Sequence, residues 1–297
     1  MTPATDRGQT PEIEPIAPAD VQRLRLGWWS RLDLNEAGRL VRTYPGLSVW
    51  MPGCGEYLLA GPWRHRPEIV HMVELSAVRY PVELTRAAIR QAQIDGRRLF
   101  LAVEMSEKRQ QSFYDQAGLR VLEDVLSFEW NGPLREYGKT VPGEFSLVRD
   151  LDERSMEALI AIDWSAFPFL WRNSVQEFHD YAGQIGVELH ILQVGDQPVG
   201  YIGLTSYAGW GHIDRVAVQA GFQGKGFGRA LVHYAVRRLA SLGATRIGLS
   251  TQRRNDRSQR LYSDIGFRRH EAGDYRIYGT SLWPDDELAE LVSEMGR

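Results

Sequence analysis

A glycine-rich segment in the C-terminal half is the part of the chain best suited to chemistry. Residues 214–228 read Asp-Arg-Val-Ala-Val-Gln-Ala-Gly-Phe-Gln-Gly-Lys-Gly-Phe-Gly, so alternating apolar residues run into a turn dense in glycine. Helical spacing of apolar residues begins directly afterwards, at Phe227. Such a turn collects backbone N–H groups at a helix N-terminus, where phosphate binds well. The segment therefore predicts a site for a phosphorylated cofactor.

Three nucleotide-binding patterns compete for this turn. A Walker A loop needs Ser or Thr after Gly-Lys, but residues 224–225 are followed by another glycine. A dinucleotide fingerprint needs a third glycine where this chain has Arg229. The pattern Gln-x-x-Gly-x-Gly is matched by Gln223, Gly226 and Gly228. The plain alternative is a tight strand-to-helix turn that needs glycine only for its backbone angles.

The matched pattern, placed after a Val-Ala-Val strand and before an amphipathic helix, resembles the acetyl-CoA-binding motif of the Gcn5-related N-acetyltransferases (GNAT). Residues 255–267 read Asn-x-x-Ser-x-x-Leu-Tyr-x-x-x-Gly-Phe and resemble the C-terminal motif of the same family. The resemblance covers residues 144–280 in family order. It implies an α/β fold with a mixed sheet and acetyl-CoA as cosubstrate.

The resemblance also implies roles for the residues of the two motifs. The turn would hold the CoA diphosphate on its backbone, through Gln223, Gly224, Lys225, Gly226, Phe227, Gly228 and Arg229. The preceding strand would pair with the pantetheine amides as an added strand does, through Val216, Ala217 and Val218. Asn255 would either bond the pantetheine or cap the following helix.

Acyl transfer to an amine also needs a proton donor for the leaving thiolate and a base for the incoming amine. By family position Tyr262 is the general acid, and its alternative role is that of a buried structural tyrosine. Asp214 is the candidate base, with an ion pair to Arg215 or to a neighbouring strand as the alternative. Glu188, His190 or a water chain could serve instead of Asp214.

Two further groups of residues have open roles. The first is a basic run of four residues, Arg253, Arg254, Arg257 and Arg260. One of these arginines could contact the CoA 3′-phosphate, or the run could form a solvated helix face. Lys225 or Arg229 could contact the phosphate instead. An aromatic loop could line the acceptor pocket or pack into the core; it comprises Phe167, Phe169 and Trp171.

The chain divides at a segment rich in turn formers, residues 131–143. We predict domains at 1–135 and 143–297. The segment 113–119 lines up with 261–267, which indicates an internal duplication. The fold class expected is therefore α/β with two tandem GNAT-like acyl-CoA N-acyltransferase domains.

The first domain is predicted to lack a CoA-binding turn. In the repeat alignment Arg79 stands opposite Gly226, and Pro81, which has no N–H, stands opposite Gly228. Tyr114, opposite Tyr262, would be a structural relic. One degenerate and one intact module in a chain of this length resemble mycothiol synthase in architecture, without indicating the substrate.

Apolar periodicity and turn residues predict the remaining elements. Helices are expected at residues 83–95, 106–116, 152–164, 174–181, 227–239, 258–265 and 285–295. Strands are expected at residues 99–103, 145–148, 188–194, 199–205, 213–218, 246–251 and 276–280.

Composition narrows the classes of protein. With 297 residues, 43% hydrophobic content and a net charge of -3, the chain is typical of a folded protein rather than a nucleic-acid or membrane binder. It shows neither a signal peptide nor an apolar run that could span a membrane, which predicts a cytoplasmic monomer or homodimer. The single cysteine, Cys54, and the absence of a Cys/His cluster predict no metal.

Taken together, the sequence predicts an acetyl-CoA-dependent N-acetyltransferase acting on a small-molecule or peptide amine. A non-catalytic acyl-CoA-binding or sensor protein on the same fold is the alternative, because binding needs only the turn.

Overall fold

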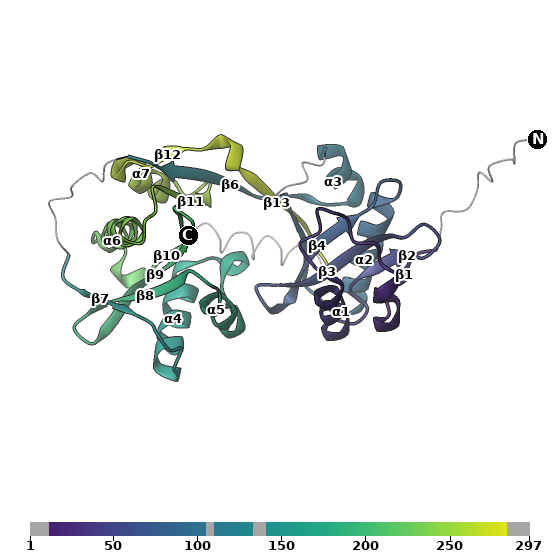
Figure 1. The fold of residues 1–297 in the computed structure, drawn as a ribbon, viewed down its shortest axis with the longest axis horizontal. Helices are drawn as coiled ribbons and strands as arrows, with labels where there is room; N and C mark the ends of the chain where they lie inside the picture. The colour runs from purple at the N-terminus through teal and green to yellow at the C-terminus, as the bar shows by residue number, and fades with distance from the viewer. Residues whose placement is uncertain (1–11, 105–109, 133–140, 284–297) are drawn as a thin grey trace, which may run out of the picture. The chain divides into compact units, whose positions relative to one another are not determined.

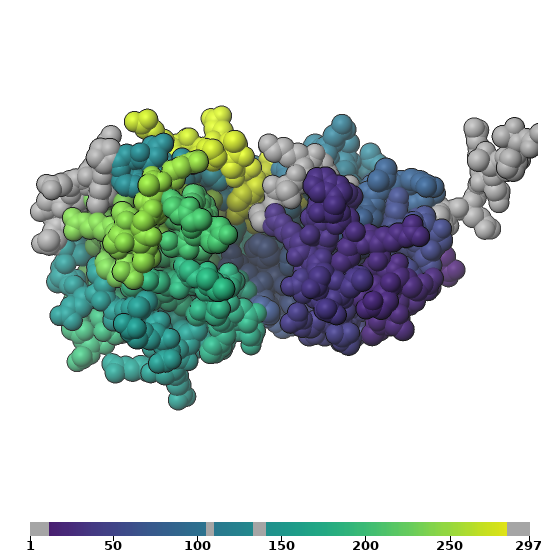
Figure 2. All heavy atoms as spheres, viewed as in Figure 1, coloured from purple at the N-terminus to yellow at the C-terminus, as the bar shows by residue number. Residues whose placement is uncertain are grey.

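The computed structural model describes residues 12–104, 110–132 and 141–283 (Figure 1). By its contacts the described chain forms two compact units. Residues 12–122 and 277–283 make up the N-terminal unit, and residues 123–276 make up the C-terminal unit. Figure 2 shows the same view with all heavy atoms drawn as spheres.

The N-terminal unit is built on a mixed sheet with strand order β1-β2-β3-β4-β5-β13, in which only β4 and β5 are parallel. Its strands are β1 (Glu14–Pro15), β2 (Val49–Met51), β3 (Glu56–Trp63), β4 (Arg66–Ser76), β5 (Leu99–Val103) and β13 (Tyr275–Ser281). Its helices are η1 (Pro18–Arg23), α1 (Leu34–Thr43), α2 (Pro81–Ile94) and α3 (Gln111–Ala117).

The C-terminal unit has the strand order β6-β11-β10-β9-β8-β7, with β12 also on β6, and only β10 and β11 are parallel. Its strands are β6 (Arg120–Trp130), β7 (Glu144–Leu147), β8 (Val187–Val194), β9 (Gln197–Tyr207), β10 (Trp210–Val218), β11 (Arg246–Gln252) and β12 (Arg268–Arg269). Its helices are α4 (Glu153–Ala166), η2 (Phe169–Trp171), α5 (Val175–Ala182), η3 (Ala220–Phe222), α6 (Phe227–Ser241), α7 (Asp256–Ile265) and η4 (Glu271–Gly273).

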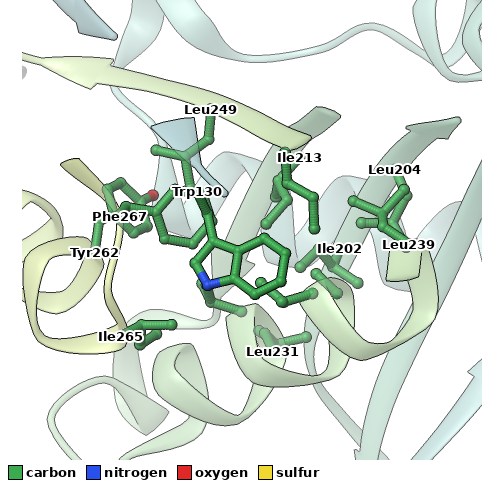
Figure 3. Packing of buried hydrophobic residues seen from close by; sticks show 14 of the residues in the cluster. Trp130, Ile202, Leu204, Ile213, Leu231, Leu239, Leu249, Tyr262, Ile265 and Phe267 are labelled. Carbon is green, nitrogen blue, oxygen red and sulfur yellow. The ribbon is translucent and has the colours of Figure 1, made fainter. Parts of the chain in front are cut away.

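Two apolar clusters hold helices on opposite faces of this second sheet. One joins α6 and α7 to the inward side chains of β6, β9, β10 and β11, as Figure 3 shows. Helix α6 contributes a stripe at helical spacing: Phe227, Leu231, Val232, Ala235, Val236 and Leu239. The other cluster packs α4 and α5 against β8, β9 and β10. Side chains that alternate along β10 therefore reach either the α6–α7 face or the α4–α5 face.

The last strand of each sheet comes from the other half of the chain. Strand β6 follows α3 but pairs with β11, where Trp130 lies opposite Ile247. Strand β13 follows α7 but pairs with β5, where Ser281 lies opposite Leu99. The contact-based units therefore cross the boundaries at 135 and 143 predicted from the sequence. The sequence gives no sign of this exchange, because strand pairing is not a local property.

Local signals located most helices well. Asp152 and Ser174 cap α4 and α5 through their side chains, and the predicted helices begin at these residues. Gly118 and Gly266 end α3 and α7 in the left-handed conformation, at φ 82° and 115°. The predicted helix at 285–295 and the start of the one at 106–116 lie outside the described residues. The β3–β4 hairpin and β6 were not predicted.

Candidate functional site

Strands β10 and β11 pair at one end and separate at the other. Residues 210–213 of β10 pair with β11, whereas residues 250–252 of β11 pair only with β6. The register of β10 against β9 shifts between Ile213 and Arg215, so Asp214 is a bulge residue. We call the part of β10 beyond this bulge, with the facing end of β11, the fork. Its β10 edge is free of any strand partner on the β11 side among the described residues.

The backbone of β10 presents polar groups to the fork. In an antiparallel pair, successive residues bond alternately to the partner strand and away from it. Gln219 donates its N–H to Val199 of β9 at 2.9 Å, so counting back along the strand Ala217 also faces β9. Val216 and Val218 then turn their N–H and C=O groups toward the fork. The predicted pantetheine positions at Val216 and Val218 are thus suitably oriented, whereas the backbone of Ala217 bonds within the sheet.

The glycine turn connects the end of β10 to α6. Gly224 and Gly226 have φ of 83° and 94°, in the left-handed region that favours glycine. Gly226 caps α6, whose first-turn N–H groups, from Phe227 onward, have no acceptor within the helix. Gly228 is different: a Cβ there would meet Leu261 Cδ2 at 3.6 Å, an ordinary contact. A glycine at 228 is therefore not required by the protein's own packing.

Gln223 ties the turn to its neighbours. Its Nε2 donates to the carbonyl of Val218 at 3.1 Å, and its Oε1 accepts from Arg257 Nη1 of α7 at 3.1 Å. The contact between Gly228 and Leu261 joins the start of α6 to α7 as well. The two sequence motifs, on the turn and on α7, are therefore brought together at the end of β10.

The cations near the turn are partly engaged. Lys225 Nζ donates to the Gly221 carbonyl at 3.0 Å, and Arg229 forms an ion pair with Asp264 at 2.6 Å. In the basic run Arg257 binds Gln223, Arg253 lies 3.7 Å from Asp124, and Arg254 forms an ion pair with Glu123 at 2.6 Å. Glu123 is only 4% exposed, and burial raises its pKa against the effect of Arg254. The basic run thus has ion-pair roles that the sequence did not reveal.

Tyr262 lies in the α6–α7 cluster (Figure 3) and is 6% exposed. Its ring packs edge-on to Phe128 at 6.0 Å and tilted to Phe267 at 6.1 Å. Burial raises its pKa to about 12, while a hydrogen bond with Ser258 acts in the opposite direction. The phenol is therefore fully protonated near neutral pH, as a proton donor must be. Asn255 caps α7 by accepting the N–H of Ser258 at 3.1 Å.

Asp214 is held by three donors on the α4–α5 face of the sheet. Tyr181 of α5 and Thr205 of β9 donate hydroxyl hydrogen bonds to Oδ2 at 2.6 and 2.7 Å. His212 Nδ1 lies 2.7 Å from Oδ1. Burial, reinforced by the Asp214 carboxylate, raises the pKa of Tyr181, so this phenol is a neutral donor. These three donors to the carboxylate come from α5, β9 and β10.

Arg215 is paired elsewhere than with Asp214. Its guanidinium forms a buried ion pair with Asp163 of α4 at 2.6 Å, and it donates to Tyr201 at 2.7 Å. It also bonds the carbonyl of Trp171 and lies 3.9 Å from the ring centroid of Phe167. Phe167 and Trp171 of the predicted aromatic loop therefore both contact β10 through the buried Arg215.

Glu188 and His190 lie apart from Asp214 in the sheet. Both lie on β8, which is separated from β10 by β9. Arg238 of α6 binds Glu188 at 2.6 Å, and Tyr234 and Glu188 both bond His190 at 2.8 Å. The Arg238 hydrogen bonds lower the pKa of Glu188 to about 2, which makes it a weak base. Glu188 and His190 therefore form a hydrogen-bonded cluster with Arg238 and Tyr234.

Comparison with known proteins agrees with this geometry. Residues 156–267 match the model of the acetyltransferase (GNAT) family. The chain contains a GNAT domain. The match includes the β10 strand, the glycine turn and α7, and it ends at Phe267. No curated protein matches the chain.

Solved structures extend the likeness beyond the GNAT domain. A tandem GNAT protein from the clavulanic acid biosynthesis pathway is similar over 93% of this chain and 99% of its own, with 14% identity and a TM-score of 0.57. A GCN5-related N-acetyltransferase from Sphaerobacter thermophilus covers 92% and 96%, with 17% identity and a TM-score of 0.56. One from Kribbella flavida covers 79% and 89%, with 14% identity and a TM-score of 0.51. The fold is thus α/β and of the tandem GNAT type.

The N-terminal unit repeats the fork of the GNAT domain. Strand β4 pairs with β5 only from Ile69 to Met72, and its register against β3 shifts at Val73. Val73 therefore occupies the place of the Asp214 bulge. Gly96 and Gly243 follow equivalent helices with φ of 73° and 91°. These shared features support the duplication inferred from the sequence.

The turn of the N-terminal unit is different. Residues 77–80 alone connect β4 to α2, and the carboxylate of Glu56 accepts the N–H groups of Val78, Arg79 and Tyr80 at 3.1, 2.9 and 2.9 Å. Burial alone would raise the pKa of Glu56, but these three N–H groups lower it overall. A side-chain anion therefore occupies the N–H groups of this turn.

The helix starts correct the repeat alignment by one residue. Pro81 is the first residue of α2, as Phe227 is of α6. Tyr80, rather than Arg79, therefore lies opposite Gly226. The predicted relic Tyr114 is buried and stacks on Tyr278 with centroids 3.6 Å apart, which suits a structural role.

Sequence reasoning missed His212, Thr205 and Tyr181 around Asp214, and Glu56 in the other unit. His-x-Asp on one strand, with a two-residue repeat, is a signal that could have identified His212. Among the described residues no cluster of His, Cys, Asp and Glu could hold a metal ion. In the same part of the chain, every helix is too short or too polar to cross a bilayer.

Proposed function

We propose that this protein is an N-acetyltransferase that moves the acetyl group of acetyl-CoA to a primary amine. The observation that carries the proposal is the fork, where the N–H and C=O of Val216 and the N–H of Val218 face outward directly before the glycine turn. An extended arm with amide groups fits such a strand edge, and a diphosphate suits the adjoining helix N-terminus. The match of residues 156–267 to the GNAT family model supports the same assignment.

The reaction has three requirements, and we assign each of them to residues of the site. The N–H groups of Gly226, Phe227, Gly228 and Arg229 would hold the diphosphate. The arm would then extend along β10 toward the Asp214 bulge, which positions the thioester at the apex of the fork. The amine nitrogen forms a bond to the carbonyl carbon as the C–S bond breaks, and Tyr262 donates its proton to the departing sulfur. No step requires a metal.

The acceptor is proposed to enter from the α4–α5 face, where Asp214 and the aromatic loop lie. A small molecule or the terminus of a peptide are the two acceptor classes that this assignment includes. The N-terminal unit is proposed not to bind CoA, because Glu56 already occupies its turn.

The test is a panel of amines assayed for thiol release from acetyl-CoA, with mass spectrometry of the products. Amine-dependent thiol release with acetylation of that amine would support the proposal. Tight CoA binding without transfer to any amine in the panel would instead indicate a binding or sensor protein. Absence of CoA binding would contradict both functions.

A further inference from the structure

His212 and Asp214 form an imidazole–carboxylate pair beside the fork. A carboxylate can only accept, so the 2.7 Å contact between Asp214 Oδ1 and His212 Nδ1 requires the proton on Nδ1. The other ring nitrogen, Nε2, is then left with a lone pair. The side chains are 27% and 26% exposed, so the pair can be reached by a substrate.

The carboxylate is itself held in place. Its Oδ2 accepts from Tyr181 of α5 and Thr205 of β9, and these two hydroxyls are the groups that face it from the packed elements. Both are neutral donors, so they orient the carboxylate and leave its charge to act on His212. The imidazole is thereby fixed in one tautomer and one orientation.

The neighbouring strand β11 has a glycine, without a side chain, next to this imidazole. His212 lies opposite Gly248 of β11, in the last stretch of pairing before the fork. A Cβ at residue 248 would lie 3.0 Å from His212 Cδ2 and 3.4 Å from Trp210 Cζ2. Trp210 also stacks on the imidazole, with centroids 5.3 Å apart and an angle of 27° between the rings. The ring is thus confined by Trp210, Asp214 and the glycine.

We propose that His212 is the general base for the incoming amine and that Asp214 is its positioning residue. This inference rests on the proposed function and replaces Asp214 as the base. The ammonium form of the acceptor gives one proton to Nε2, which passes it to water. The neutral amine then forms the C–N bond as the C–S bond breaks, and sulfur gains a proton from Tyr262. The amine gives its second proton to Nε2, and transfer of this proton through water restores the Tyr262 phenol. The sum is an amide, a thiol and one released proton.

The experiment compares His212→Gln, Asp214→Asn and Gly248→Ala in the full chain, with His179→Gln on the exposed side of α5 as the matched control. We expect His212→Gln to lower kcat by about 10²-fold or more, with CoA affinity unchanged and the acidic limb of the pH–rate profile lost. Asp214→Asn should lower kcat less and keep that limb. Gly248→Ala should displace the imidazole and lower kcat, and His179→Gln should do nothing.

Nitrogen NMR of His212 provides a readout that does not depend on turnover. The expected neutral form carries its proton on Nδ1, and Asp214→Asn should abolish that preference. A larger loss in Asp214→Asn than in His212→Gln would assign the base to Asp214 and overturn the inference. If the wild type acetylates an amine and His212→Gln has the same kcat, the inference is contradicted and the proposed function is not. A wild type that binds CoA but acetylates no amine would contradict the proposed function, and the inference with it.

Discussion

The carboxylate of Glu56 accepts the backbone N–H of Arg79 at 2.9 Å, in the turn before α2. In the GNAT domain the corresponding turn before α6 is longer and rich in glycine. Both units have a fork and a bulge at corresponding places, and they differ at the turn where a diphosphate would bind. In one turn a carboxylate accepts the N–H groups at the start of a helix, and in the other turn we propose that a diphosphate accepts the equivalent N–H groups.

Glu56→Gln should destabilise the N-terminal unit by about 0.3–1 kcal/mol at neutral pH, because a charge at a helix N-terminus is lost. The folded pKa of Glu56 lies below 4.5. Its contribution is therefore complete above that pH and is lost as the pH falls through the folded pKa. Denaturant unfolding at pH 6 and pH 3 should show the difference between variant and wild type shrinking at low pH. Glu14→Gln, which changes an exposed carboxylate on β1, is the control. An equal difference at both pH values would contradict the assignment.

Gly228→Ala should weaken CoA binding by at least about tenfold while the melting temperature stays near that of the wild type. The reason is that a Cβ at 228 meets only ordinary contacts within the protein, so its effect falls on the approaching diphosphate. Gly221→Ala, where a Cβ would find open space, is the matched control. Titration calorimetry measures both. Unchanged affinity in Gly228→Ala would show that the diphosphate does not approach this backbone.

Tyr262→Phe should lower kcat by about 10²-fold, because the thiolate loses its proton donor, and CoA affinity should be retained. With a pKa of about 12, the phenol stays protonated across the usual assay range, so it should add no basic limb to the pH–rate profile. Tyr114→Phe, the counterpart in the N-terminal unit, should leave kcat unchanged. Steady-state kinetics would reject the acid role if both variants behaved alike.

Asp163→Asn should lower the free energy of unfolding by about 3–5 kcal/mol, because Arg215 would remain buried without its counter-charge. The Asp163 side chain is fully buried, at 0% exposure. Asp264→Asn removes the partner of Arg229 where the carboxylate is 59% exposed, and it should cost less than about 1 kcal/mol. Chemical denaturation compares the two. Similar small losses would mean that the buried pair does not anchor the aromatic loop.

Short-range features of the fold were predictable from the sequence. The glycine turn, the left-handed ends at Gly118 and Gly266 and the caps at Asp152 and Ser174 follow from a few neighbouring residues, because backbone angles and caps are local properties. The repeat was visible for the same reason: it preserves helix ends and their spacing.

Features that depend on distant residues were not predictable. The bulge at Asp214 exists only in the register of β10 against β9, and the exchange of β6 and β13 depends on pairing across more than a hundred residues. Glu56 lies far along the chain from the turn that it occupies. The donors that orient Asp214 were not predictable either, since they come from α5 and β9 as well as from its own strand.

A titration of CoA into the full chain tests most directly the claim that the fold is present twice and the working turn once. We expect one site per chain. Gly226→Ala should abolish it, because alanine is strained in the left-handed conformation that Gly226 adopts, and Glu56→Gln should retain it. Two sites per chain, or one site indifferent to Gly226→Ala, would contradict the claim.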